Sequence, residues 1–207
     1  MQRHNIIAVV LLASVTLLVV TVGYAKGWGA LGLINLGVVR LTGGNNSSAD
    51  RLISESKSPP APELAPGSWI NSEPLTLKNL RGRVVLLEFW TFGCYNCRNT
   101  LPYVKQWNER YGNQGLTTIG VHSPEFDEER SLENVRREVN SLGIKYAVIT
   151  DNAYETWRAY NVEAWPTIIV LDKAGRVRWM HVGEGAYDET ERTIQQLLAE
   201  SADVPPS

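Results

Sequence analysis

The chain contains the stretch Val84-Val85-Leu86-Leu87-Glu88-Phe89-Trp90-Thr91-Phe92-Gly93-Cys94-Tyr95-Asn96-Cys97, which decides its fold. Residues 84–90 are apolar except for Glu88, and a continuous apolar run of this kind predicts a central β-strand covered on both faces. A short loop follows, and Cys94 then begins a helix that we expect to reach about Tyr111. The stretch therefore predicts a strand, a loop and a helix, with both cysteines at the start of the helix.

The residues after this helix alternate between strand and helix patterns. Apolar runs predict further strands at 116–121, 146–150, 167–171 and 176–181. Apolar residues three and four apart predict a helix at 131–142, and Ile194, Leu197 and Leu198 form the buried side of a helix expected near the C-terminus. A short helix is expected at 154–160, with Asp151 or Asn152 as its cap. The order β-α-β-α-β-α-β-β-α predicts an α/β fold, a mixed central sheet with helices on both faces.

An apolar run, residues 6–22, lies near the N-terminus between Arg3 and Lys26. As a helix it would reach roughly 26 Å, slightly less than a hydrocarbon core of about 30 Å. Two interpretations stay open: a signal peptide cleaved near Gly23-Tyr24-Ala25, or an uncleaved anchor extended by the apolar residues 28–41. Either one predicts that the rest of the chain is exported.

The change in composition along the chain predicts its organisation. We expect residues 1–41 to be a membrane anchor or signal segment and 42–66 to be a flexible linker rich in glycine, serine and proline. Residues 67–203 form the expected folded domain, and 204–207 form a tail.

The overall composition argues against several classes of function. The 207 residues carry a formal net charge of −2 without a long basic run, so a nucleic-acid partner has little electrostatic support. The chain has only two cysteines, so it lacks the second cysteine pair that a zinc site would need, and its three histidines are scattered. Neither a zinc site nor a cofactor is therefore expected. We expect the chain to be a monomer.

The pair Cys94 and Cys97 carries the expected chemistry. Unpaired N–H groups and a partial positive charge at a helix N-terminus favour a thiolate, which is the attacking species. Cys94 would be the exposed, reactive sulfur, and Cys97, one turn further in, would resolve the mixed disulfide. A purely structural disulfide is the alternative, but closing so short a loop contributes only about 2 kcal/mol in the loop-entropy model.

Residues 67–200 resemble the thioredoxin superfamily, specifically its exported TlpA/ResA-type branch and the thioredoxin-like C-terminal part of DipZ-type proteins. The motifs that carry the resemblance are Leu87-Glu88-Phe89-Trp90-Thr91, the Cys94–Cys97 motif with Leu101-Pro102-Tyr103-Val104, Gly120-Val121-His122-Ser123-Pro124-Glu125, Trp165-Pro166-Thr167 and Gly183-Glu184-Gly185-Ala186-Tyr187-Asp188. The resemblance implies a thioredoxin fold in which residues 123–142 are an inserted helical segment.

The resemblance also implies roles for three further residues. Glu88 matches a buried acid behind the second cysteine, and a raised pKa would let it exchange a proton with Cys97. Pro166 matches a cis-proline beside the cysteines, where the backbone of Trp165 would pair with an extended substrate strand. Three features depart from the family pattern: Gly93 replaces a frequent tryptophan, the inner pair Tyr95-Asn96 replaces Gly-Pro, and Thr100 replaces the glutamate of ResA-type members. Together they put the redox potential and a ResA-like partner set in question.

The leading hypothesis is a thiol–disulfide oxidoreductase for exported protein disulfides or dithiols, reset by a membrane electron donor. Its expected location is the bacterial inner membrane, with a single-pass anchor and the domain in the periplasm or outside the cell. Two alternatives stay open: a thiol peroxidase of peroxiredoxin-like type, and a non-catalytic module that binds extended peptides. We also expect His122 to be a hydrogen-bonded strand-end residue and the charged run 125–130 to be a solvated face of the insertion.

Overall fold

The computed structural model describes residues 52–201 of the chain. The expected membrane segment 1–41, the first part of the expected linker and the tail 204–207 lie outside the described residues. Among the helices of residues 52–201, none is both long enough and apolar enough to cross a membrane.

A six-stranded mixed sheet forms the centre of the described part, in the order β1-β4-β3-β2-β5-β6. Its strands are β1 (Trp69–Ile70), β2 (Val84–Trp90), β3 (Leu116–His122), β4 (Ala147–Thr150), β5 (Thr167–Leu171) and β6 (Val177–Val182). Strand β2 lies in the interior, parallel to β3 and antiparallel to β5. Its position confirms the strand expected from the apolar run.

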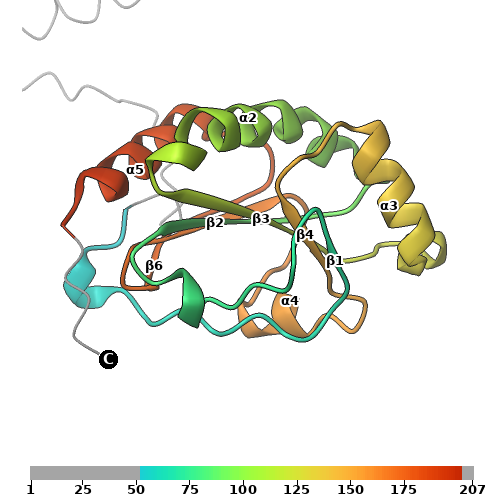
Figure 1. Ribbon diagram of the computed structural model, residues 1–207, viewed down its shortest axis with the longest axis horizontal. Coiled ribbons are helices and arrows are strands. Elements are labelled where there is room, and N and C mark those ends of the chain that lie inside the picture. Colours follow the sequence, from blue (N-terminus) through green and yellow to red (C-terminus); the bar gives the residue numbers. More distant parts are fainter. Residues whose placement is uncertain (1–51, 202–207) are drawn as a thin grey trace, which may run out of the picture. The chain divides into compact units, whose positions relative to one another are not determined.

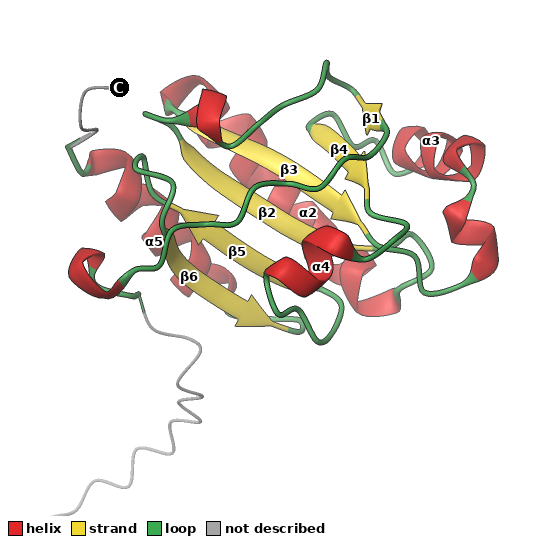
Figure 2. Ribbon diagram, turned by 90° about the horizontal axis from the view of Figure 1, so that it is seen from below, coloured by secondary structure: helices red, strands yellow, loops and turns green. Residues whose placement is uncertain are grey.

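Helices cover both faces of this sheet (Figures 1 and 2). The α-helices are α2 (Tyr95–Tyr111), α3 (Leu132–Ser141), α4 (Glu155–Ala159) and α5 (Tyr187–Ala199), and short 3-10 helices are η1 (Glu55–Lys57), η2 (Lys78–Leu80), η3 (Gly112–Gln114) and η4 (Asp127–Arg130). Figure 1 shows α2 and α5 on one face and α4 on the other. The mixed sheet with helices on both faces is therefore confirmed. The helices η4 and α3 lie between β3 and β4, in the segment that the resemblance implies is an insertion.

Polar side chains cap the N-termini of α3, which follows β3, and of α4, which follows β4. The hydroxyl of Ser131 accepts a hydrogen bond from the backbone N–H of Asn134 and so caps α3. The carboxylate of Asp151 accepts hydrogen bonds from the N–H groups of Thr156 and Trp157 at the start of α4. Both contacts satisfy N–H groups that have no partner inside their helix.

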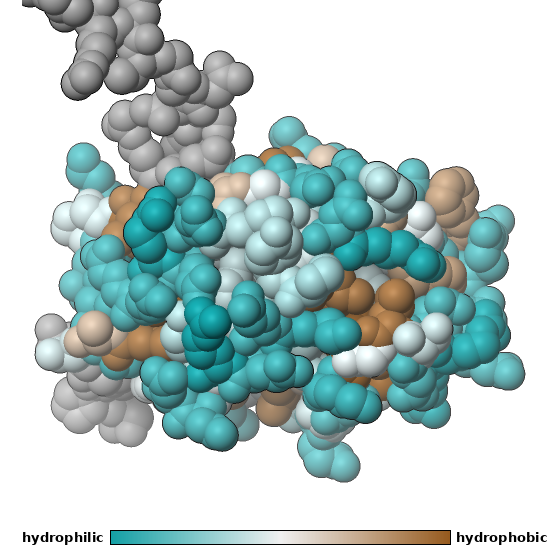
Figure 3. All heavy atoms as spheres, turned by 90° about the horizontal axis from the view of Figure 1, so that it is seen from above, coloured by the Kyte–Doolittle hydropathy of each residue, from teal (hydrophilic) through white to brown (hydrophobic). Residues whose placement is uncertain are grey.

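Successive side chains of β2 point to opposite faces of the sheet, and they divide the core into two layers. Val84, Leu86 and Trp90 pack in one apolar cluster with residues of α2 and α5, and the intervening residues pack in a second cluster with Tyr160. All seven residues of β2 are buried. The outer surface above α2 and α5 is mainly hydrophilic, with separate hydrophobic patches (Figure 3). Because side chains alternate along a strand, a β2 residue an even number of positions from Leu86 and Trp90 faces α2.

Residues 53–61 differ from the expected linker because they pair with the edge of the sheet at β6. The N–H of Ile53 donates to the carbonyl of Arg178 at 2.8 Å, and the N–H of Val177 donates to the carbonyl of Pro59 at 2.9 Å. The side chain of Arg178 is 4% exposed and donates from Nε to the carbonyl of Ile53 at 2.7 Å. The prolines and serines of this segment predicted an extended chain. An extended chain can form backbone hydrogen bonds with the open edge of a sheet, as it does here with β6.

Candidate active site

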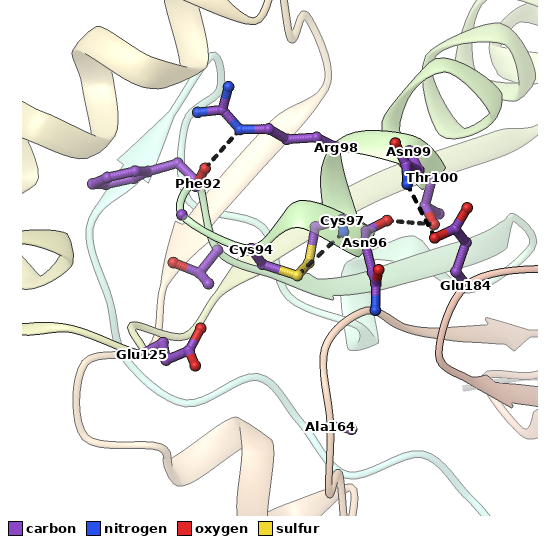
Figure 4. Close-up of a disulfide and its surroundings, with 12 residues drawn as sticks. Phe92, Cys94, Asn96, Cys97, Arg98, Asn99, Thr100, Glu125, Ala164 and Glu184 are labelled. Carbon is purple, nitrogen blue, oxygen red and sulfur yellow. Dashed lines mark hydrogen bonds between the residues drawn. A yellow bond between two sulfur atoms is a disulfide. The ribbon is translucent and has the colours of Figure 1, made fainter.

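Cys94 and Cys97 form a disulfide at the N-terminus of α2 (Figure 4). Cys94 is the residue that caps the helix, and its Sγ accepts a hydrogen bond from the backbone N–H of Cys97 at 3.1 Å. Cys94 is half-buried, whereas Cys97 is only 2% exposed and packs in the core cluster under α2. One sulfur therefore lies at the surface and the other behind it.

This geometry makes the two sulfurs chemically unequal. A sulfur that accepts a backbone N–H at a helix N-terminus is stabilised as a thiolate by that hydrogen bond and by the helix dipole. Cys97 is shielded by the core, where burial disfavours the charged form. Cys94 is therefore the sulfur suited to attack a partner in solution, and Cys97 is the sulfur suited to attack Cys94.

The loop before Cys94 is attached to the insertion by Glu129. Its Oε1 accepts the backbone N–H of Gly93 at 2.9 Å, and its Oε2 accepts those of Glu125 and Phe126 at 2.5 and 3.0 Å. Burial alone would raise the pKa of Glu129, but these hydrogen bonds and one from the hydroxyl of Thr91 lower it. The carboxylate is thus held in its charged form by the loop that it positions.

Glu129 is a residue that the sequence interpretation missed. The run 125–130 was expected to be a solvated face, and for Glu129 this is wrong because the residue is 1% exposed. The available signal was Gly93 itself, because an added Cβ there would collide with Oε1 of Glu129. A glycine before the first cysteine thus indicates that another group approaches the loop closely.

His122 lies at the end of β3, next to the same loop. Its Nε2 is 3.3 Å from Oγ1 of Thr91, and its ring stacks on Phe92 at a centroid distance of 5.6 Å. Burial lowers the pKa of His122 to about 4, and the charge of Glu129 opposes that shift only in part. The imidazole is therefore neutral near pH 7, and His122 packs the loop as the hydrogen-bonded strand-end residue that we expected.

Glu88 projects from β2 toward α2, between Leu86 and Trp90, on the same face of the sheet as Cys97. It is fully buried, and Oε2 accepts a hydrogen bond from the hydroxyl of Tyr146 at 2.6 Å. Burial raises the pKa of Glu88 to about 7, and the hydrogen bond from Tyr146 opposes that rise. A carboxyl group with such a pKa can both take up and release a proton near neutral pH.

Trp165 and Pro166 lie in the loop before β5, and the peptide bond between them is cis. Pro166 is buried, and the half-buried ring of Trp165 packs on Trp157 at a centroid distance of 4.5 Å. Figure 4 shows Ala164, the residue before this pair, among the surroundings of the disulfide. The chain thus brings the loop of Trp165 and Pro166 to the side of the helix on which Cys94 is found.

Two of the noted departures also have defined places in the structure. Tyr95 is 76% exposed beside Cys94, and Thr100 is buried on the inner side of α2. The hydroxyl of Thr100 donates to the carbonyl of Asn96 at 3.1 Å, within its own helix. Within residues 52–201 no group of three or more histidine, cysteine, aspartate or glutamate side chains could hold a metal ion.

The sequence model of the Redoxin family matches residues 60–198, which include every site residue described above. The chain belongs to the Redoxin family. Protein DipZ of Mycobacterium bovis is 42% identical to this Redoxin-family chain over 133 residues, which are 63% of the chain but 19% of DipZ. The chain therefore spans about a fifth of the length of that relative.

Two further comparisons connect this Redoxin-family chain with proteins named for thiol–disulfide chemistry. The thiol-disulfide oxidoreductase ResA of Bacillus thuringiensis is 27% identical over 128 residues, which cover 62% of the chain and 71% of ResA. The crystal structure of a thiol-disulfide isomerase from Corynebacterium glutamicum superposes with a TM-score of 0.62 at 28% identity, covering 68% of the chain and 98% of that structure. The thioredoxin-like fold implied by the sequence motifs is confirmed.

Proposed function

We propose that the chain is a thiol–disulfide oxidoreductase that exchanges disulfides with exported proteins through Cys94 and Cys97. The observation that carries this proposal is the hydrogen bond from the N–H of Cys97 to Sγ of Cys94, at a half-buried helix N-terminus. A reversible disulfide at such a position serves electron transfer better than it serves stability. Similarity to ResA and to the isomerase supports the same chemistry.

The first step begins from the reduced pair. The thiolate of Cys94 attacks one sulfur of a substrate disulfide, the substrate S–S bond breaks, and the released substrate thiolate takes a proton from water. A mixed disulfide now joins Cys94 to the substrate. The N–H of Cys97 stabilises the Cys94 thiolate before the attack.

The second step uses Cys97 and the buried acid. Glu88, as a carboxylate, accepts the proton of the Cys97 thiol, and the Cys97 thiolate attacks Sγ of Cys94. The mixed disulfide breaks, the second substrate sulfur leaves as a thiolate that takes a proton from water, and the Cys94–Cys97 disulfide forms. The substrate gains two electrons and the pair loses two, so a dithiol donor must reduce the pair before the next cycle.

Trp165 and Pro166 are the proposed substrate-binding residues. An extended substrate segment that pairs with the backbone of Trp165 would place its disulfide over Cys94. Changing Trp165 to alanine should raise KM for a protein disulfide at least severalfold, with little effect on a small aromatic disulfide. An equal loss for both substrates would contradict substrate binding by this residue.

The proposed location is the bacterial inner membrane, with the domain on the outer side and a membrane electron donor as the partner that resets the pair. The apolar run 6–22 supports this proposal. Expression of the full chain in a bacterium should give a carbonate-resistant membrane protein that protease digests only after the outer membrane is opened. Recovery in the soluble cytoplasmic fraction would contradict it.

Catalytic reduction of insulin disulfides tests the proposed chemistry. The wild type should accelerate it, Cys94→Ser should abolish the acceleration, and Cys97→Ser should trap a mixed disulfide with the substrate. If Cys94→Ser retained activity, the proposal would be wrong. Peroxide consumption that survived Cys97→Ser would instead indicate a thiol peroxidase, and peptide binding without turnover would indicate a non-catalytic module.

A further inference from the structure

Tyr146 reaches the buried acid from the far side of a neighbouring strand. It lies just before β4, which is not adjacent to β2 in the sheet, because β3 runs between them. Its hydroxyl nevertheless donates to Oε2 of Glu88 at 2.6 Å, and the two side chains are 4% and 0% exposed. The phenol must therefore cross β3 within the core.

Gly120 opens the path for that crossing. It is the residue of β3 that pairs with Glu88. An added Cβ at this position would lie 3.3 Å from Cε2 of Tyr146 and 2.8 Å from Nε1 of Trp90. A glycine inside a strand marks a place where other groups approach the backbone closely, and here those groups include the Trp90 indole and the Tyr146 ring.

The two oxygens of Glu88 are not equivalent. Oε2 accepts the Tyr146 hydroxyl, whereas Oε1 is buried and has no hydrogen-bond partner among the described residues. A charged oxygen without a partner is costly in the core, so Oε1 is the oxygen on which a proton is most stable. The hydroxyl of Tyr146 continues to donate to Oε2 whether Oε1 is protonated or not.

We propose that Tyr146 is a positioning residue for proton exchange, which holds Oε2 of Glu88 so that Oε1 takes up the Cys97 proton and returns it. This inference rests on the proposed function, in which Glu88 accepts that proton. In the oxidising direction the S–H bond of Cys97 breaks and an O–H bond forms at Oε1, and reduction of the disulfide reverses the transfer. Tyr146 keeps its own proton throughout.

Few other groups can influence this titration. The residues beside Glu88 in the sheet are Gly120 on β3 and Ile168 on β5, and neither is titratable. Helix α2 contributes Cys97 on this face. Burial raises the pKa of Glu88, and among the described residues Tyr146 supplies the one opposing contribution. Loss of the hydroxyl should therefore raise that pKa further.

The test uses the full chain with Tyr146→Phe, which removes the hydroxyl and keeps the ring. The carboxyl ¹³C resonance of Glu88, assigned by its loss in Glu88→Gln, is titrated in the oxidised protein. Its midpoint should rise by about 1 pH unit or more, the size expected for a hydrogen bond to a charged group. The rate of insulin reduction at pH 6 should fall about tenfold and should recover at alkaline pH.

Tyr111→Phe is the matched control, because the Tyr111 hydroxyl also donates to a carboxylate, that of Glu191, at 2.6 Å. This variant should leave both the midpoint and the rate profile unchanged. An unchanged midpoint in Tyr146→Phe would overturn the inference, as would an equal fall in rate at every pH.

A second variant protects the test against misfolding of Tyr146→Phe. A fluorotyrosine at position 146 is a stronger donor of nearly the same size and should lower the midpoint, and no change would overturn the inference. If the wild type reduced no protein disulfide, the proposed function would fail. The oxidised-state titration would still decide whether Tyr146 controls Glu88.

Discussion

The backbone N–H of Gly93 donates to Oε1 of Glu129 at 2.9 Å, which attaches the residue before Cys94 to the inserted segment. The same carboxylate accepts the N–H groups of Glu125 and Phe126, so three backbone donors from two segments converge on one side chain. A Cβ on Gly93 would occupy the space that Oε1 needs. Glu129 and its segment thus help to set the position of Cys94.

Gly93→Ala should destabilise the fold by about 1–3 kcal/mol, because the added methyl group forces Glu129 or the loop to move. Urea unfolding measures the change. Gly112→Ala is the matched control: Gly112 has an ordinary helical φ of −55°, and nothing lies within 4 Å of an added Cβ there. Equal stability of the two variants would show that Glu129 does not restrict position 93.

Alkylation of the reduced protein should distinguish the two cysteines. Iodoacetamide at neutral pH should label Cys94 faster than a free cysteine, whose pKa is about 8.5, and should leave Cys97 almost unlabelled. The reason is the hydrogen bond from the Cys97 N–H to Cys94 and the burial of Cys97. Peptide mass spectrometry after timed labelling measures both rates, and equal labelling would contradict the assignment.

Glu88 should make the protein more stable at mildly acidic pH. Its folded pKa is raised from 4.5 to about 7, mainly by burial, so between these values the folded state binds a proton that the unfolded state lacks. Its contribution is complete below pH 4.5 and is lost as the pH rises through 7, a change of about 3 kcal/mol. Glu88→Gln should remove this dependence in urea unfolding across that range. A difference from wild type that does not vary with pH would contradict the raised pKa.

His122 should make the folded protein less stable as the pH falls, which is the opposite of the effect of Glu88. Burial lowers its pKa from 6.5 to about 4, so its contribution to stability is complete above pH 6.5 and is lost as the pH falls through 4. Between pH 4.5 and 6.5 it opposes the contribution of Glu88. His122→Gln should therefore gain stability relative to wild type as the pH falls across this window. If the free-energy difference stayed constant, a neutral buried His122 would be excluded.

The N-terminal segment 53–61 should be needed for full stability. A variant that begins at residue 67, the boundary predicted from composition, loses the carbonyl of Ile53 that the buried Arg178 side chain binds. We expect a loss of about 1–3 kcal/mol relative to a variant that begins at residue 52, because a buried charged donor loses its acceptor. Thermal unfolding of both variants measures this, and identical midpoints would argue against the pairing.

Local patterns were enough to predict much of the fold. The apolar run of β2 predicted a strand buried on both faces, and the spacing of Val135 and Val139 predicted the buried side of α3. These predictions succeed because burial repeats with the geometry of a single strand or helix. The cysteine pair could be assigned for the same reason, since a strand, loop and helix within one short stretch place Cys94 at the helix end.

The contacts between distant segments could not be predicted in this way. Glu129 looked like part of a solvated charged run, and Tyr146 looked like the first residue of a strand. Glu129 is 36 residues from Gly93 and Tyr146 is 58 residues from Glu88, so no local period connects either pair.

The sequence by itself determined which residues are the candidates for the chemistry: two cysteines at a helix start and one acid inside an apolar strand. Only the tertiary structure decided how these residues are tuned, through Tyr146 crossing β3 over Gly120 and Glu129 holding the loop before Cys94. The physical reason is that hydrogen bonds and burial depend on which segments meet in space, whereas helix and strand periodicity depend on neighbours along the chain.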